Sequence, residues 1–167
     1  VELLHSAGIV HCDLQCSNWL VRSDVMSGSW GEWCAEPDSA TGKRAGWGAK
    51  GLQLVDFGSA IDLQLHEAGT MFTGPRAASG FACPAMLNGG EWREDADLAA
   101  IAGCLHQMLF GAPMEISGST ESGYQLAADI PASWSRGLWE RVFGGLLNCG
   151  GRARSVASQL RGALEAH

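Results

Sequence analysis

The stretch His11-Cys12-Asp13-Leu14-Gln15-Cys16-Ser17-Asn18 decides how the rest of the chain is interpreted. In it, an Asp follows a His by two positions and precedes an Asn by five, which is the spacing of a phosphotransferase catalytic loop. Asp56-Phe57-Gly58 begins thirty-eight positions after Asn18. Phosphoryl transfer needs a carboxylate near the attacking hydroxyl and oxygen ligands that hold Mg²⁺ against the phosphates. The two motifs, each beside a strand-like apolar segment, together predict that chemistry, although either alone is a weak signal.

Each residue type in the two motifs suits one part of this reaction. Asp13 is the predicted general base, or the carboxylate that orients the attacking hydroxyl. Asn18 and Asp56 are the predicted Mg²⁺ ligands, because amide and carboxylate oxygens are hard donors. Phe57 is expected to pack so that it sets the orientation of Asp56, and Gly58 to let the chain turn sharply. The predicted cofactors are therefore ATP and Mg²⁺.

Two positions of the catalytic loop depart from the usual protein-kinase pattern. Gln15 stands where those enzymes usually have a Lys that touches the transferring phosphate. A neutral amide donates a hydrogen bond but gives no charge stabilisation, and losing a cationic donor costs roughly 100- to 1000-fold in rate. Cys12 replaces an Arg that would pair with a phosphorylated activation segment. We therefore expect little dependence on such phosphorylation.

Two further polar residues are predicted to support the loop. His11 is interpreted as a structural residue, hydrogen-bonded beneath the loop, and not as an acid or base. Asp97 falls early in a predicted buried helix, where a carboxylate is costly unless it accepts hydrogen bonds. It is expected to accept backbone N–H groups of the catalytic loop. The alternative is a helix-start Asp that is favoured by the helix dipole.

Composition limits the class of protein. The 167 residues are 46% hydrophobic and 17% charged, which is typical of one globular domain. The net charge of −7 argues against sequence-independent nucleic-acid binding, and no apolar run is long enough to span a membrane. The chain begins without an initiator Met or a signal peptide, so we expect a fragment of a larger gene product.

The six cysteines form no C-x-x-C pair. A zinc site that uses Cys12 and Cys16 with His5 and His11 is one interpretation, but no second ligand pair follows at finger spacing. Reduced thiols in an intracellular protein, mostly buried, are the preferred interpretation.

Apolar periodicity predicts a mainly α, α+β fold with short strands around the two motifs. The catalytic loop and the D-F-G motif are flanked by the strands 9–10, 19–21 and 52–55. Helices are predicted at 1–8, 95–110, 134–147 and, capped by Ser155, 155–166. Loops are predicted at 24–50, which is Gly- and Trp-rich, and at 114–132. Such a composition is typical of the larger lobe of a kinase fold.

A longer pattern extends beyond the general kinase motifs. An I-D hydrophobic stretch, a G-T-x-F-T turn, an S-G-F-x-C segment and an M-L-F-G end occur at Ile61-Asp62, Gly69–Thr73, Ser79–Cys83 and Met108–Gly111. This pattern closely resembles that of the Bub-type mitotic checkpoint serine/threonine kinases. The resemblance covers most of residues 9–111 and fades beyond them. One departure is Cys83-Pro84-Ala85, where the A-P-E position lacks its acidic residue.

The resemblance implies a serine/threonine protein kinase of the spindle assembly checkpoint, located in the nucleus at kinetochores and in part in the cytoplasm. It implies protein substrates, a histone tail among them, and checkpoint partners that bind through regions outside this chain. It also implies an activation segment ordered without phosphorylation. From the net charge and the lack of a long apolar run, we expect neither nucleic acid nor a membrane as a partner. An insertion between the catalytic-loop strand and the D-F-G strand, here 24–50, belongs to the same pattern.

Residues 1–167 are thus expected to be the C-terminal lobe of a kinase domain. No glycine-rich loop or strand Lys of a smaller lobe is present. The isolated chain is therefore expected to transfer no phosphate. Two alternatives stay open. One is a catalytically impaired pseudokinase or scaffold of the same family, which Gln15 and Ala85 favour. The other is a small-molecule kinase of the aminoglycoside or choline type.

Overall fold

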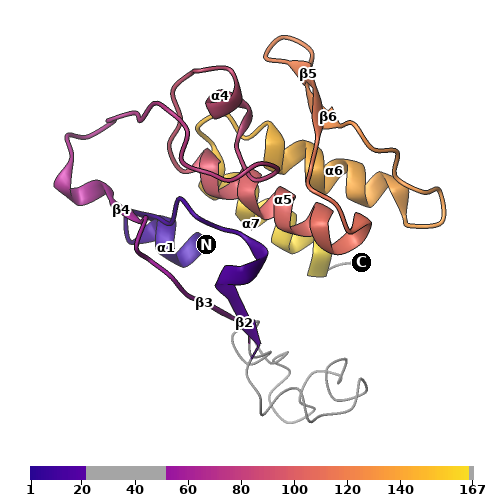
Figure 1. Cartoon of the computed structure of the whole chain (residues 1–167), viewed down its shortest axis with the longest axis horizontal. Coiled ribbons are helices and arrows are strands. Elements are labelled where there is room, and N and C mark those ends of the chain that lie inside the picture. Colours follow the sequence, from indigo (N-terminus) through magenta and orange to yellow (C-terminus); the bar gives the residue numbers. More distant parts are fainter. Residues whose placement is uncertain (22–51, 166–167) are drawn as a thin grey trace. The chain divides into compact units, whose positions relative to one another are not determined.

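The computed structural model describes residues 1–21 and 52–165, and the predicted loop 24–50 lies outside these ranges. The chain divides into two compact units. The first comprises Val1–Gln15 together with the chain from Phe57 onward, and the second is Cys16–Asp56. Each unit is described by itself. The fold is helix-rich with a few short strands, as the sequence predicts (Figure 1).

Helices build most of the first unit. Its long helices are α5, α6 and α7, at Asp95–Phe110, Arg136–Leu147 and Ala153–Glu165, and the short helices α1 (Glu2–Ser6) and α4 (Pro84–Leu87) belong to the same unit. Helices α5, α6 and α7 pack on one another, and α1 packs on α7. No helix in the described part of the chain is long and apolar enough to cross a membrane.

Helix α5 is the centre of this unit. Its bounds are those predicted from the sequence, because apolar residues surround its axis almost completely and Gly111 ends it at a left-handed φ of 69°. Leu98 on α5 is fully buried, as are Trp92 just before the helix and Phe143 on α6. Burying side chains of this size supplies about 2 kcal/mol or more each, and all three belong to the hydrophobic core of the unit.

Three pairs of short antiparallel strands complete the described structure. In the first unit β1 (Ile9–Val10) pairs with β4 (Ile61–Asp62). In the second unit β2 (Trp19–Val21) pairs with β3 (Leu52–Leu54), with Trp19 opposite Leu54. The predicted strands at 9–10 and 19–21 are confirmed, and the predicted 52–55 strand ends one residue earlier. Two 3₁₀ turns lie beside these strands, at Cys16–Asn18 and Leu63–Leu65.

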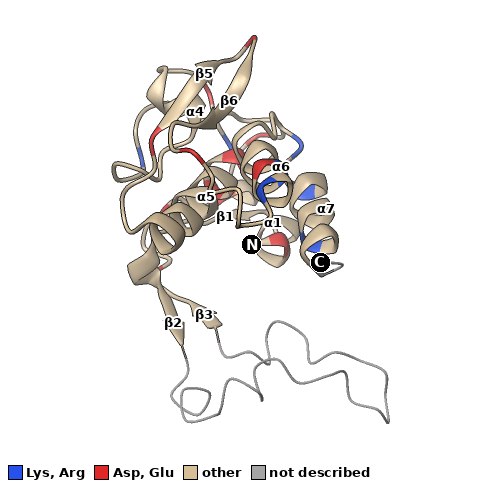
Figure 2. Ribbon diagram, turned by 90° about the vertical axis from the view of Figure 1, so that its right-hand side faces the viewer, with Lys and Arg blue, Asp and Glu red and all other residues tan. Residues whose placement is uncertain are grey.

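The prediction of a loop over 114–132 is wrong. This segment contains a hairpin of β5 (Ile116–Ser119) and β6 (Gly123–Leu126), which stands out from the helices of its unit (Figures 1 and 2). Its sequence is rich in Ser and Gly, so no alternation of apolar residues announces strands. The Asn148 side chain holds the hairpin to the end of α6. Its Oδ1 accepts from the Tyr124 backbone N–H at 2.7 Å, and its Nδ2 donates to the Tyr124 carbonyl at 2.8 Å.

The last helix also differs from its prediction. Helix α7 begins at Ala153, two residues before the predicted Ser155 cap. The Ser155 hydroxyl instead donates to the Arg152 carbonyl at 3.0 Å, within the first turn. Serine commonly makes such local bonds both in caps and inside helices, so its presence alone did not locate the helix start.

Glycines bring the S-G-F-x-C segment against α5. Gly80 has a φ of 85°, a backbone conformation that favours glycine. A Cβ atom on Gly103 of α5 would clash with the Gly80 carbonyl oxygen and with Phe81. The close packing of this segment on the helix therefore requires glycine at both positions.

Gly103→Ala should destabilise the protein although alanine favours helices. The new methyl group meets backbone atoms, so we expect a loss of at least about 2 kcal/mol in the free energy of unfolding. Urea denaturation of the chain measures it.

The matched control is Gly144→Ala on α6, where an added Cβ meets nothing within 4 Å. This variant should be unchanged or more stable by up to about 1 kcal/mol. If both variants lose similar stability, the close approach at Gly103 is not the cause.

Candidate functional site: the catalytic loop and its supports

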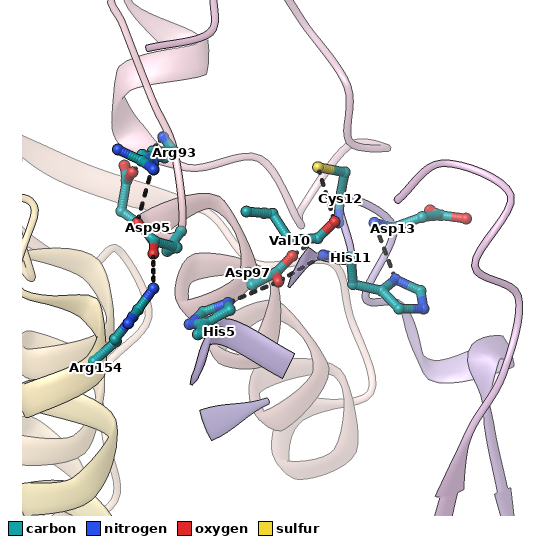
Figure 3. Close-up of polar contacts among 10 residues, drawn as sticks. His5, Val10, His11, Cys12, Asp13, Arg93, Asp95, Asp97 and Arg154 are labelled. Atoms are coloured by element: carbon teal, nitrogen blue, oxygen red, sulfur yellow. Dashed lines mark hydrogen bonds and ion pairs between the residues drawn. The ribbon is translucent and has the colours of Figure 1, made fainter. Parts of the chain in front are cut away.

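A buried carboxylate holds the backbone of the predicted catalytic loop. Asp97 on α5 is fully buried. Its Oδ2 accepts from the His11 backbone N–H at 2.8 Å, and its Oδ1 accepts from the Cys12 backbone N–H at 2.9 Å (Figure 3). These are the hydrogen bonds expected if Asp97 accepts backbone N–H groups of the catalytic loop. Hydrogen bonds to a charged group contribute about 1.5–3 kcal/mol each, which offsets the cost of burying the carboxylate.

A third donor, His5, completes the environment of this carboxylate. The His5 ring on α1 is fully buried, and its Nε2 lies 2.9 Å from Asp97 Oδ2. Because a carboxylate only accepts hydrogen bonds, Nε2 carries the proton. His5 therefore fixes α1 to α5 through the same group that holds the catalytic loop. The sequence analysis did not assign His5 this role. A His in the last turn of a short helix gave no signal of its own.

The backbone of the loop is strained where Asp97 holds it. Cys12 has a φ of 64°, in the left-handed region that non-glycine residues rarely occupy. Such a conformation costs about 1–3 kcal/mol and persists only where surrounding contacts impose it. The bonds from Asp97 to the N–H groups of His11 and Cys12 are such contacts. The Cys12 thiol is buried and points to the Val10 carbonyl, with a sulfur–oxygen distance of 3.7 Å.

Asp13, the predicted general base, is held by its neighbours. Its backbone N–H donates to His11 Nδ1 at 3.3 Å, which gives the buried His11 ring the structural role predicted for it. The Gln15 amide Nε2 lies 3.2 and 3.3 Å from the two carboxylate oxygens of Asp13. Gln15 thus orients the Asp13 carboxylate by hydrogen bonding. A neutral amide can make this interaction, although it lacks the positive charge of a Lys.

The D-F-G motif lies across the boundary between the two units, with Phe57 and Gly58 in the first. The Phe57 ring packs edge-on against His11, with ring centroids 4.8 Å apart. Phe57 is 46% exposed, so its packing within the described residues is only partial. Within the motif Asp56 has a left-handed φ of 63°. The sharp turn expected at Gly58 is present, since the Ala60 backbone N–H donates to the Phe57 carbonyl at 3.1 Å across it.

In the second unit, strand pairing brings the two predicted Mg²⁺ ligands close in the backbone. The Val55 backbone N–H donates to the Asn18 carbonyl at 3.0 Å, continuing the β2–β3 ladder, and Asp56 is the next residue. Asn18 is 7% exposed. An amide and a carboxylate on adjacent backbone positions are a donor set that suits Mg²⁺, which takes one or two protein ligands and completes its shell from phosphates and water.

The segment that follows the D-F-G motif is fixed by Trp92. The backbones of Phe72 and Trp92 exchange two hydrogen bonds, at 2.9 and 2.8 Å. The fully buried Trp92 indole donates to the Gly74 carbonyl at 2.9 Å. The Phe72 ring lies between Trp92 and His66, with centroid distances of 5.5 and 5.2 Å. These contacts fix the segment to the residues just before α5.

The missing carboxylate at Ala85 leaves the arginines near α7 with other partners. Arg154 donates to Glu94 Oε1 at 3.1 Å, and the other Glu94 oxygen lies 3.5 Å from Arg93 Nε. Arg152 donates through Nε to the Cys149 carbonyl at 3.3 Å. Glu94, immediately before α5, therefore neutralises Arg154. This role of Glu94 was not foreseen, because ion pairs between distant segments leave no local pattern.

The comparisons with known proteins agree with this geometry. The chain is 35% identical to the mitotic checkpoint serine/threonine-protein kinase BUB1 of Arabidopsis thaliana over 89% of this chain and 28% of that protein. It is 30% identical to the spindle assembly checkpoint serine/threonine-protein kinase BUB1 of Saccharomyces cerevisiae over 100% of this chain and 16% of that protein. The crystal structure of the BubR1 kinase domain matches with a TM-score of 0.68 at 26% identity. The chain belongs to the Bub-type family of checkpoint kinases.

The match also defines which part of the family the chain represents. It covers 99% of this chain but 48% of the BubR1 kinase domain, so the Bub-type chain has the fold of a kinase C-terminal lobe. The chain spans less than a third of the length of the curated relatives it matches. No protein-family model matches it. The fold class and the family predicted from the sequence are confirmed.

The zinc interpretation of the cysteines finds no support in this geometry. His5 is engaged with Asp97, and within residues 1–21 and 52–165 no group of three His, Cys, Asp or Glu side chains is arranged to hold a metal ion. Burial raises the pKa of the Cys12 thiol to about 12, and the nearby Asp97 charge adds to the effect.

Asp97→Asn should disrupt the catalytic loop from within the core. The Asn side chain has one acceptor oxygen and an NH₂ group, so a backbone N–H of the loop loses its partner. We expect a loss of about 3 kcal/mol in the free energy of unfolding, measured by urea denaturation.

Asp62→Asn is the matched control. Asp62 is exposed and its Oδ1 accepts from the Gln64 backbone N–H at 2.9 Å, an N-cap bond that Asn also makes. Its stability should change by less than about 0.5 kcal/mol. Equal losses in the two variants would show that Asp97 has no special structural role.

The buried thiols should resist alkylation. Desolvation raises the pKa of Cys12 to about 12 and that of both Cys83 and Cys149 to about 11. At pH 8 they should react with iodoacetamide at least about 100-fold more slowly in the folded protein than in urea, because the thiolate is the nucleophile. Peptide mass spectrometry reports each site. The partly exposed Cys16 serves as the internal comparison, and equal protection of Cys16 would indicate that burial is not the cause.

Proposed function

We propose that this chain is the larger lobe of a serine/threonine kinase that transfers the γ-phosphate of ATP to protein hydroxyls in spindle checkpoint signalling. The observation that carries the proposal is the Asp97 carboxylate bound to the backbone of the loop that bears Asp13. Relatives named as mitotic checkpoint serine/threonine kinases support the choice of reaction. The domain is residues 1–167, with the 24–50 insertion outside the described residues.

In this proposal Asp13 is the catalytic carboxylate. It would accept the proton of the substrate Ser or Thr hydroxyl while Gln15 keeps its two oxygens oriented. Asn18 and Asp56 would hold Mg²⁺, which supplies charge stabilisation to the phosphates when bound. His11 and Asp97 are positioning residues, because they act on the loop backbone.

We further propose that the protein functions without phosphorylation of its activation segment. Cys12 offers no cation to a phosphate group, and the Phe72–Trp92 pairing holds the segment by backbone and indole hydrogen bonds instead. The proposed location is the kinetochore in the nucleus, with a part in the cytoplasm. The proposed substrates are proteins, a histone tail among them, and checkpoint partners bind through regions outside this chain.

A catalytically impaired scaffold is the second candidate. Gln15 favours it, because an amide at hydrogen-bonding distance from Asp13 orients the carboxylate but adds no positive charge near a transferring phosphate. The small-molecule kinase alternative is not favoured, since the relatives named above are protein kinases.

Asp13→Asn in the full-length protein should lower phosphate transfer by at least about 100-fold, because the amide cannot accept the hydroxyl proton. Transfer of labelled phosphate from ATP to histone measures it. The control Asp62→Asn should retain the wild-type rate. A wild-type rate in the Asp13 variant would contradict the assignment, and the isolated 167-residue chain is expected to show no turnover.

The variant Gln15→Lys separates the two candidates in the same assay. A gain of about 10-fold or more would indicate a catalytic loop impaired by its amide, as the scaffold requires. An unchanged rate in an active protein would show that orientation by Gln15 is sufficient.

A further inference from the structure

A second site lies in the first unit, at the end of α5 and the base of the β5–β6 hairpin. It is a pocket of about 320 Å³. Its walls come from the last turn of α5, the turn that follows it and the ends of the two strands, and include His106, Phe110, Pro113, Glu115 and Ala127. A volume at the low end of ligand sites suits one amino-acid side chain better than a larger molecule.

The first chemical feature of this pocket is a hydrogen-bond acceptor without a donor. His106 is 3% exposed, and its Nδ1 lies 2.9 Å from the Ala112 carbonyl. Because a carbonyl only accepts, Nδ1 carries the proton, and Nε2 of the neutral ring is an acceptor. Within the described part of the chain, Nε2 is buried and has no hydrogen-bond partner. A buried polar atom of this kind is costly and calls for an explanation.

The second feature is negative charge. Glu115 is exposed at the mouth of the pocket, and none of the cations in the described residues forms an ion pair with it. Between Met114 and Ser135 the sequence has Glu115, Glu121 and Asp129 but no Lys or Arg. Figure 2 shows this hairpin without a basic segment.

The third feature is an aromatic wall. The Phe110 ring stacks on His106, with centroids 4.5 Å apart and an interplanar angle of 21°, and its centroid lies 5.4 Å from that of Trp134. Pro113 and Ala127 add apolar surface. Aromatic faces attract cations, and apolar walls accommodate the methylene groups of a long side chain.

An acceptor, a carboxylate and an aromatic face together select a ligand that only donates hydrogen bonds and is positively charged. An anion would be repelled by Glu115, and an apolar group would leave His106 Nε2 unsatisfied. We propose that this pocket binds the side chain of an arginine in an extended basic segment of a partner protein. The planar guanidinium has five donors and stacks on aromatic rings, which suits these walls better than a Lys ammonium.

The shape of the site favours a protein partner over a small molecule. Ala112, Pro113 and Ala127 are exposed, so the pocket opens to solvent, where a peptide can deliver a side chain. Because Nε2 is covered by neighbouring atoms, a donor reaches it only through a small movement of the turn after α5. The acidic hairpin adds attraction for further basic residues of the segment. Binding here requires no phosphoryl transfer.

The test uses the 167-residue chain and two blocked pentapeptides, Gly-Ala-Arg-Ala-Gly and the same peptide with citrulline for Arg. Citrulline keeps the shape but removes the charge. Calorimetry and amide NMR without ATP should show that the Arg peptide binds at least about five-fold more tightly and shifts the Ala112 and Ala127 resonances. Equal affinities would overturn the proposal, as would binding of argininamide as tight as that of the Arg peptide.

Two charge reversals on the same hairpin make the matched pair of variants. Glu115→Lys should lower the affinity for the Arg peptide by at least about ten-fold, because it replaces electrostatic attraction by repulsion. Glu121→Lys, exposed at the turn and outside the pocket, should change affinity by less than about three-fold. Equal losses would overturn the proposal in favour of general charge attraction. Thermal melting shows whether Glu115→Lys folds. If it does not, the comparison of the Arg and citrulline peptides on the wild-type chain still tests the proposal.

Discussion

The conformation of the catalytic loop depends on one buried charge, the carboxylate of Asp97. It binds two consecutive backbone N–H groups, those of His11 and Cys12, and the ring of His5. Few other groups can do this, because an amide has one acceptor and water would not be fixed in direction. The left-handed conformation of Cys12 follows from it, and that conformation directs the chain from β1 toward Asp13. Gln15 then orients the Asp13 side chain on a backbone that the Asp97 hydrogen bonds already hold.

Much of this arrangement could be predicted because the relevant signals are local. Each of these signals is contained in one short stretch of sequence. They are the catalytic-loop spacing, the apolar run of α5 and the short strands on either side of Asn18. Asp97 could be inferred because a carboxylate in a buried helix must find donors, and a neighbouring loop is their usual source. The family resemblance rests on the same kind of contiguous pattern, and the relatives confirm it.

What the sequence did not reveal depends on partners far apart in the chain. The hairpin is held by Asn148, twenty-four residues from Tyr124, so its strands need no apolar alternation of their own. The pairing of Glu94 with Arg154 spans sixty residues. The pocket beside His106 arises only when the end of α5 meets the hairpin. The left-handed φ at Asp56 was not predicted, because non-glycine residues rarely adopt it and no local pattern marks the exception.

The separation between Asp97 and the loop it holds has a consequence for synthesis of the protein. The acceptor, Asp97, follows Cys12 by eighty-five positions. On the ribosome the loop emerges first, and the hydrogen bonds from Asp97 cannot form until α5 has been made and has folded. The nascent chain therefore carries an immature loop through more than half the length of this sequence. The loop acquires its conformation in a late step, when the central helix docks, and not when the motif itself is translated.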